Sequence, residues 1–394
     1  MQQHLSSYCL ALCAGLTIMG IHLAPAADGF MLYQSGTQYL KFGGRVQVQY
    51  HKNDLDPGTD TEDVFFRRVT PYLEAGLGKD WLARAQVELV SSSTGRRKTA
   101  YKDNYLQYKG VKNIQINIGN AGFPYSREFL TSAERQQFVE RTVTGNRSYG
   151  VPYRNLGVHV LGQCADTRIS YGLSVASATL HQDTTKILFD SPLDRVDPYQ
   201  SGWIAGGRVD YHPYGKLAFS QGDFDGKTKA TVGVAAYTWN NNGHTLYTNP
   251  GGISTSTTKN DVDQIRAIEL SGAVRYRGLS ADAEYNKIDA DAVDRNFTGT
   301  GSGNLYKNGH AALHSYMAKG GYMAIANKLE LVAGYQGLEA DTYKKAWTTA
   351  FVGANWFFNK HDLKLQTTFA RSKDVKGAPG KDQDELFAQL QAVF

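Results

Sequence analysis

The residues best suited to chemistry lie in one connection, residues 121–153, which carries both cationic and anionic side chains. These charged residues are Arg127, Glu128, Glu134, Arg135, Glu140, Arg141 and Arg147. Within the connection, Thr131-Ser132-Ala133-Glu134 has the spacing of a capping box, which predicts a short helix that starts there. A helix end and its arginines would present positive charge to a nearby solute.

Two roles for these arginines stay open. In the first, they contact a solute directly, and an anion about 5 Å from one arginine gains roughly 1 to 3 kcal/mol at an effective dielectric constant of 20 to 80. In the second, arginines and glutamates pair with one another and pin the connection to its surroundings. Passage of a solute needs weak, multiple contacts rather than one tight site, which scattered arginines could supply.

The elements that must position these residues show alternation of apolar and polar side chains, which is typical of β-strands. In residues 81–89, Trp, Ala, Val and Leu share one face, and Arg84, Gln86 and Glu88 share the other. The sequence predicts sixteen strands, near 38–51, 63–77, 80–91, 101–110, 113–120, 154–163, 166–178, 201–212, 229–239, 264–277, 279–289, 312–326, 328–338, 346–358, 361–373 and 382–394. Residues 216–226 are interpreted as part of a turn, because an extra strand would make the number odd.

The length of these strands distinguishes two all-β classes. Soluble sandwiches and propellers also alternate, but soluble strands average about five or six residues. Here the segments have about ten or more residues, enough for a tilted strand to cross a bilayer. Aromatic residues such as Trp81, Trp239 and Trp356 lie at strand ends, and the chain stops on Phe394. We therefore expect a 16-stranded antiparallel transmembrane β-barrel with short periplasmic turns and long extracellular loops.

Composition excludes other classes. The chain has 394 residues, and no run of 18 apolar residues follows the first 27, so a polytopic helical transporter is excluded. The net charge of +5 is spread along the chain, which argues against nucleic-acid binding. No nucleophile has a partner at useful spacing, so we expect neither an enzyme nor a cofactor. A gated receptor would need a plug before a 22-stranded barrel, whereas strands begin by Gln38.

The N-terminal residues have the pattern of an export signal. An apolar run from Cys9 to Leu23 precedes the small residues of 24–27, so we expect residues 1–27 to be a cleaved signal peptide. Residues 28–394 would then form a single barrel domain in which 121–153 is a pore-constricting loop. Only Cys164 remains after cleavage, so no internal disulfide is expected.

Alternation also assigns charged side chains to the lumen, because a charge facing lipid at mid-membrane costs roughly 2 to 4 kcal/mol. The candidate pore-lining residues, with the loop arginines added, are Lys41, Arg45, Arg68, Arg84, Lys109, Arg127, Arg135, Arg141, Arg168 and Arg208. The same alternation directs Glu269, Asp282, Glu284 and Glu330 inward and puts Arg67 on the lipid-facing side. The acidic residues Asp54, Asp56, Asp60, Glu62 and Asp63 are interpreted as a solvated first loop, with a divalent cation or lipopolysaccharide as the alternative ligand. No metal site is expected.

Several stretches, in this order and spacing, resemble the porin O/P family, the phosphate-selective porins of Gram-negative outer membranes. They are Phe42-Gly43-Gly44-Arg45-Val46-Gln47, Phe66-Arg67-Arg68-Val69, Glu74 to Trp81, Tyr105 to Gly110, Gly119-Asn120, Phe123-Pro124-Tyr125, Leu130-Thr131-Ser132, Glu140-Arg141, Arg154 to Val158 and Phe394. The resemblance implies a sixteen-stranded, trimeric, water-filled channel whose third loop folds into the lumen. This chain departs from the family in two ways. The family typically has Lys-Glu-Pro-Phe where this chain has Gly122-Phe123-Pro124-Tyr125, and the central strands of this chain have few arginines.

The expected function is passive diffusion of small hydrophilic solutes through an outer-membrane channel, with a mild preference for anions such as phosphate or chloride. The departures favour a general anion preference over phosphate specificity. The expected surroundings are outer-membrane lipid and lipopolysaccharide, and the expected assembly is a homotrimer. The alternatives are a non-specific general porin and a structural outer-membrane protein whose lumen is sealed.

Overall fold

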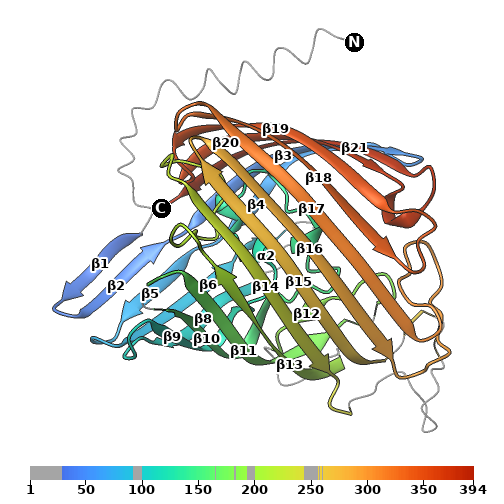
Figure 1. Ribbon diagram of the computed structural model, residues 1–394, viewed down its shortest axis with the longest axis horizontal. Coiled ribbons are helices and arrows are strands. Elements are labelled where there is room, and N and C mark those ends of the chain that lie inside the picture. Colours follow the sequence, from blue (N-terminus) through green and yellow to red (C-terminus); the bar gives the residue numbers. More distant parts are fainter. Residues whose placement is uncertain are drawn as a thin grey trace.

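The computed structural model describes residues 29–91, 100–164, 166–181, 183–192, 200–243, 256, 258–259 and 261–394. The predicted signal peptide, residues 1–27, lies outside these residues. The described chain is all-β: its strand segments form one antiparallel sheet that curves round an interior holding the short helix α2 (Arg127–Leu130) (Figure 1). No helix among the described residues is long and apolar enough to cross a membrane.

The sheet is assembled from 21 strand segments. They are β1 (Phe30–Ser35), β2 (Gln38–Gly43), β3 (Arg45–Asp56), β4 (Thr61–Val69), β5 (Tyr72–Gly76), β6 (Trp81–Glu88), β7 (Val90–Ser91), β8 (Ala100–Tyr108), β9 (Ile114–Gly122), β10 (Arg154–Gln163), β11 (Ile169–Leu180), β12 (Phe189–Asp190), β13 (Gln200–Tyr211), β14 (Lys229–Asn240), β15 (Val262–Tyr276), β16 (Leu279–Ala292), β17 (His310–Ile325), β18 (Leu329–Ala340), β19 (Trp347–Asn359), β20 (Leu363–Lys373) and β21 (Asp382–Val393).

The predicted number of sixteen strands is not confirmed, because the N-terminal part of the sheet is divided into short segments. Gly44 separates β2 from β3, and residues 70–71 separate β4 from β5. Pro71 has no N–H to donate to a neighbouring strand, which accounts for the second break. The prediction also missed β1, which pairs with β2 as a hairpin that projects from one end of the sheet (Figure 1).

Strands adjacent in sequence pair in turn from β13 to β21, and β21 then pairs with β3. The last strand therefore lies beside one of the first. Short turns such as 277–278, 326–328 and 360–362 gather at one end of the strands, here called the turn end. Longer connections, including 123–153 and 293–309, gather at the other end, here called the loop end.

The outer face of the sheet is apolar, as alternation predicts. On β14, Val232 and Val234 are 65% and 51% exposed, whereas the flanking Thr231 and Ala235 are buried. This pattern is the inverse of that of a soluble sheet, because the exposed positions carry the apolar side chains. The interior therefore contains the polar and charged residues, together with the connections that fold into it.

Two bulges change which residues face the interior. On β4, Arg67 is an extra residue between the pairs Gln47↔Arg68 and Val48↔Phe66. On β8, two residues, Lys102 and Asp103, lie opposite the single residue between Ala85 and Val87 of β6. A bulge interrupts the period of two and re-aims side chains. The prediction that Arg67 faces lipid is therefore wrong: its guanidinium pairs with Glu140 of the connection inside the barrel.

Part of the interior is a packed apolar core at the loop end. Connection 123–153 contributes Phe123, Tyr125 and Phe129, the connection containing Ile187 adds a further side chain, and Trp239 of β14 completes the contact. The segment between β13 and β14, residues 212–228, contains no strand, as predicted. It is not a simple turn, however, because Gln221 reaches the connection 123–153 from the turn end and hydrogen-bonds to Glu128.

Gly119 fixes the path of β9 where that strand passes between β8 and β10. Its φ is +137°, and an added Cβ would lie 2.4 Å from the Asn104 carbonyl oxygen. We expect Gly119→Ala to destabilise the folded barrel by about 2 kcal/mol or more, because both strain and a backbone clash must be relieved. The measurement is the unfolding midpoint in urea with lipid vesicles. Gly122→Ala is the matched control, since nothing lies within 4 Å of its added Cβ, and an equal shift in both variants would contradict this account.

Candidate functional site

The connection between β9 and β10 folds into short helical turns. Ser126 caps α2, because its Oγ accepts a hydrogen bond of 3.0 Å from the Phe129 amide. A short helical turn does start at the predicted place, because the three-residue 3-10 helix η2 (Ala133–Arg135) follows Thr131 and Ser132. The predicted capping is not formed: Ser132 makes no side-chain cap hydrogen bond, and Thr131 Oγ1 donates to the Arg127 carbonyl of α2 instead. A second 3-10 turn, η3 (Val143–Gly145), lies further along.

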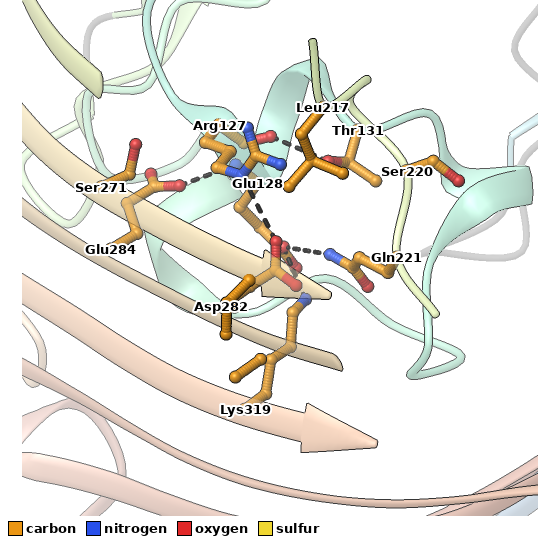
Figure 2. Close-up of polar contacts among 12 residues, drawn as sticks. Arg127, Glu128, Thr131, Leu217, Ser220, Gln221, Ser271, Asp282, Glu284 and Lys319 are labelled. Atoms are coloured by element: carbon orange, nitrogen blue, oxygen red, sulfur yellow. Dashed lines mark hydrogen bonds and ion pairs between the residues drawn. The ribbon is translucent and has the colours of Figure 1, made fainter. Parts of the chain in front are cut away.

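Glu128 is the main attachment of this connection to the barrel wall (Figure 2). Its carboxylate accepts from Lys319 Nζ of β17 at 2.6 Å, from Gln221 Nε2 at 2.9 Å and from the Thr142 amide at 3.1 Å. Burial alone would raise the pKa of Glu128, but the Lys319 ammonium and these hydrogen bonds outweigh burial and lower it. Glu128 therefore stays ionised and joins three segments of the chain.

Two arginines predicted to line the pore are instead buried in ion pairs. Arg127 Nε lies 3.3 Å from Asp282 Oδ1 of β16 (Figure 2). Arg208 of β13 pairs with Asp210 at 2.7 Å and with Glu269 of β15 at 2.8 Å. Arg208 also donates to the Tyr125 carbonyl at 2.7 Å. At both positions the guanidinium attaches the connection to the wall, which is the pinning role.

The opposite side of the connection borders a cavity of about 330 Å³, here called the cationic cavity. Six cationic side chains line it: Arg45, Arg68, Arg84, Lys102, Arg141 and Arg154. Only two carboxylates line it, and both are paired. Asp103 accepts two hydrogen bonds from Arg154, at 2.9 and 3.1 Å, and Glu134 lies 3.3 Å from Arg45.

Charge compensation around this cavity is partial. Arg84 pairs with Glu74 at 3.1 Å, and Lys102 pairs with Glu88. Arg141 differs, because its Nη2 donates to the Phe129 and Thr131 carbonyls and its Nε has no hydrogen-bond partner. Among the described residues, no carboxylate forms an ion pair with Arg141. The cavity therefore has an excess of positive charge.

The other predicted pore-lining residues lie elsewhere. Arg168 and Lys109 are exposed in turns at the turn end, the first with a side chain 60% exposed. Arg135 lies 3.8 Å from Glu134 with its side chain half exposed. Lys41 of β2 lies over the Tyr39 ring, 5.2 Å from its centroid. The structure thus brings Arg45, Arg68, Arg84 and Arg141 together at the cationic cavity. The residues outside that cavity are Arg168, Lys109, Arg135 and Lys41.

Sequence reasoning missed two members of the cavity, Lys102 and Arg154. Lys102 faces inward because of the bulge in β8, which alternation does not reveal. Arg154 is the first residue of β10, and at the end of a strand alternation constrains the direction of a side chain only weakly. Both cations lie 4.7 Å from the Tyr153 ring centroid. The one available signal was the pair of adjacent charges, Lys102-Asp103, inside a strand where a period of two permits only one to face inward.

A second cavity of about 700 Å³ adjoins the cationic cavity toward the turn end, and the two share Asp103, Gly122 and Leu130 as lining residues. Both cavities lie along β8, β9 and β10. In the part of the chain that the structure describes, no three His, Cys, Asp or Glu side chains are grouped to hold a metal ion. The cations that line the cationic cavity can attract an anion by their charge.

Glu140 gives the attachment of the connection a pH dependence. Burial would raise its pKa, but the Arg67 guanidinium, at 2.6 Å, lowers the pKa to about 2 from an ordinary 4.5. The pair therefore stabilises the fold fully above about 4.5, and this contribution is lost as pH falls through about 2. We expect the melting temperature of wild type to exceed that of Glu140→Gln at pH 6 and the two to converge near pH 2. A constant difference over that range would contradict the ion pair.

The apolar outer face, the lumen occupied by a folded connection and the charged cavity beside it are features of outer-membrane β-barrels of the porin kind. Similarity to a porin family and to solved outer-membrane barrels supports an integral outer-membrane channel rather than an enzyme. Residues 40–186, which are 147 of the 394, match the family described as Phosphate-selective porin O and P. The resemblance predicted from the sequence is confirmed over these residues.

Solved structures of similar fold are outer-membrane porins. OmpT of Vibrio cholerae is 12% identical with a TM-score of 0.57, over 92% of this chain and 99% of that one. OmpF of Salmonella typhi, in complex with daunomycin, is 12% identical with a TM-score of 0.57, over 92% and 100%. The anion-selective porin from Comamonas acidovorans is 12% identical with a TM-score of 0.55, over 91% and 100%. At these identities the likeness establishes the fold, and among curated proteins none matches this chain.

Proposed function

We propose that this protein conducts small hydrophilic solutes passively across the outer membrane with a mild preference for anions. The observation that carries the proposal is the charge balance of the cationic cavity: four of its six cations are paired with carboxylates, and Arg68 and Arg141 form no ion pair among the described residues. Positive charge left over in a narrow, poorly screened path raises the local concentration of anions and repels cations. Arg45, Arg68, Arg84 and Arg141 are the predicted residues that would contact the anion, and Lys102 and Arg154 join them.

The proposal includes an architecture for the channel. β2 with β3, β4 with β5, and β6 with β7 would each make one membrane crossing. With β1 and the two-residue β12 left out, the remaining segments give sixteen crossings. The pairing of β21 with β3 supports a barrel closed at that point. Residues 1–27 would be removed on export, residues 28–394 would form the single barrel domain, and residues 121–153 would narrow the path. The turn end would face the periplasm, and the loop end would meet lipopolysaccharide outside the cell.

Homotrimer assembly is part of the same proposal. One solved structure of similar fold is described as the trimer form of OmpT of Vibrio cholerae, with 12% identity and a TM-score of 0.54. A general anion preference, with chloride and phosphate among the solutes, is favoured over phosphate specificity. Gly122 stands where the family typically has lysine, and Arg208 is buried in its own ion pairs.

A structural role with a sealed lumen is the second candidate, and the apolar core of the loop end favours it. Phe123, Phe189 and Trp239 are fully buried there, so this part of the interior admits no solute. The cationic cavity lies outside that core, which favours conduction. The two candidates differ in whether the purified protein conducts at all.

The reversal potential of single channels in a planar bilayer under a KCl gradient tests the proposal. A potential displaced toward the chloride equilibrium value is the expected result. Phosphate is then titrated into the chamber, and weak block only at high concentration is expected for a general anion channel. Absence of conductance would favour the structural role, and a potential displaced toward potassium would overturn the anion preference.

A further inference from the structure

We propose that the solute this channel binds best is an organic monoanion with an apolar body, such as an aromatic carboxylate, rather than a small inorganic anion. The inference rests on the proposed function and specifies the solute of the same path. Its basis is the contrast between the two adjoining cavities. One presents cations, and the other, which shares three lining residues with it, presents an apolar wall.

The apolar wall is made of side chains that no neighbour fully covers. Tyr105 of β8, Leu161 of β10, Leu130 at the end of α2 and Phe219 of the segment 212–228 line the larger cavity and are each half-buried. Pro124 completes the wall. These residues come from four separate elements, so a continuous apolar surface forms only in the folded chain.

Two contacts fix the shape of this wall. An added Cβ at Gly172 would lie 2.7 Å from Pro124 Cβ, so β11 and the connection are in close contact there. The guanidinium of Arg127 lies 5.3 Å from the centre of the Phe219 ring, and that of Arg208 lies 5.6 Å from it. Because both arginines are held by buried carboxylates, the ring they contact is held as well.

Positive charge flanks the apolar wall on both sides. The cationic cavity lies on one side, with Arg141 lacking a carboxylate partner among the described residues. At the turn end, the exposed lysines Lys109, Lys112 and Lys216 line the mouth of the larger cavity. Lys216 Nζ donates to Gln163 Oε1 at 3.2 Å, so the amide and not a carboxylate accepts from it. An anion is therefore attracted to both ends of an apolar segment.

The chemistry of the two surfaces selects the solute class. A hydrated inorganic anion gains from the cations but gains nothing from contact with the apolar wall. A carboxylate attached to a ring can direct its charge toward the cationic cavity while its ring displaces water from the adjoining apolar wall. Burial of apolar surface is favourable. Sites that hold small molecules commonly combine an apolar lining with a few placed polar groups.

The test compares three anions, benzoate, acetate and inorganic phosphate, as blockers of the chloride current through single channels. We expect benzoate to block at a concentration about tenfold lower than acetate does, because its ring covers part of the apolar wall. Leu161→Asn should abolish most of this ratio without changing the block by acetate. Arg141→Gln should weaken block by benzoate and acetate by the same factor and keep the ratio.

Binding of benzoate and acetate to the detergent-solubilised protein, measured by saturation-transfer NMR, gives a second readout that does not need conduction. Equal affinities for benzoate and acetate would overturn the inference, and a chloride-selective channel would still support the proposed function. Preference for phosphate over benzoate would also overturn it. A preference for benzoate in a channel that selects potassium would support the binding site and contradict the proposed anion preference.

Discussion

Replacing Glu128 by alanine is expected to detach the connection 123–153 from the barrel wall and to cost about 3–5 kcal/mol of stability. The variant leaves the Lys319 ammonium buried without its partner, and both side chains of the pair are 1% exposed. Gln221 and the Thr142 amide lose the same acceptor. The measurement is the temperature at which the folded barrel unfolds on gel electrophoresis, together with single-channel conductance. Conductance should rise and become noisy, because a detached connection widens the path intermittently.

Asp225→Ala provides the matched control for that change. Asp225 pairs with Lys229 at 2.7 Å, but the two side chains are 45% and 31% exposed. Exposed pairs of this kind contribute about 0–1 kcal/mol, so the control should behave as wild type. Comparable losses in the two variants would show that burial of the Glu128 pair has no special role. Glu128→Gln adds a conservative change that keeps the hydrogen-bonding shape and removes the charge.

Replacing Arg141 by glutamine is expected to lower the chloride-to-potassium permeability ratio by about fivefold. One positive charge about 5 Å from a passing anion is worth roughly 1 kcal/mol or more, and 1.4 kcal/mol is tenfold. Arg141 is the informative cation because its removal leaves no carboxylate without a partner, whereas loss of Lys102 or Arg154 would free Glu88 or Asp103. The measurement is the reversal potential under a KCl gradient.

Arg168→Gln is the control for selectivity, since it removes the same charge from an exposed turn outside both cavities. It should leave the reversal potential unchanged at physiological salt, where exposed charges are screened over about 8 Å. If Arg168→Gln shifted selectivity as much as Arg141→Gln, the cationic cavity would not be the selective part of the path. The comparison therefore separates local charge from the overall charge of the protein.

Alternation alone was sufficient to predict an all-β chain with an apolar outer face and charges inside. Predicted segments such as 229–239 correspond closely to β14, Lys229–Asn240. It failed at Arg67 and Lys102, where bulges add a residue to one strand. A bulge depends on the pairing of two strands, so a single strand's pattern does not reveal it. The number of strand segments differs because Gly44 and residues 70–71 interrupt the N-terminal strands and because alternation missed β1.

The candidate site was predictable in composition but not in arrangement. The sequence of 121–153 shows that arginines and glutamates are concentrated there, and strand parity directs Glu269, Asp282 and Glu330 inward. Parity specifies the face of a residue but not its height in the barrel or its partner. Arg127 pairs with a carboxylate 155 residues away, and Glu128 with an ammonium 191 residues away.

What the sequence determined by itself is the class of protein: a period of two along long strands, together with inward charges, permits an outer-membrane barrel and little else. The tertiary structure decided which cations are neutralised. Arg127 and Arg208 meet buried carboxylates of β16 and β15. Lys319 of β17 meets Glu128 of the connection, and these pairs attach the connection to the wall. The cations that line the cationic cavity meet too few carboxylates, since Arg68 and Arg141 form no ion pair among the described residues, and their charge stays available there.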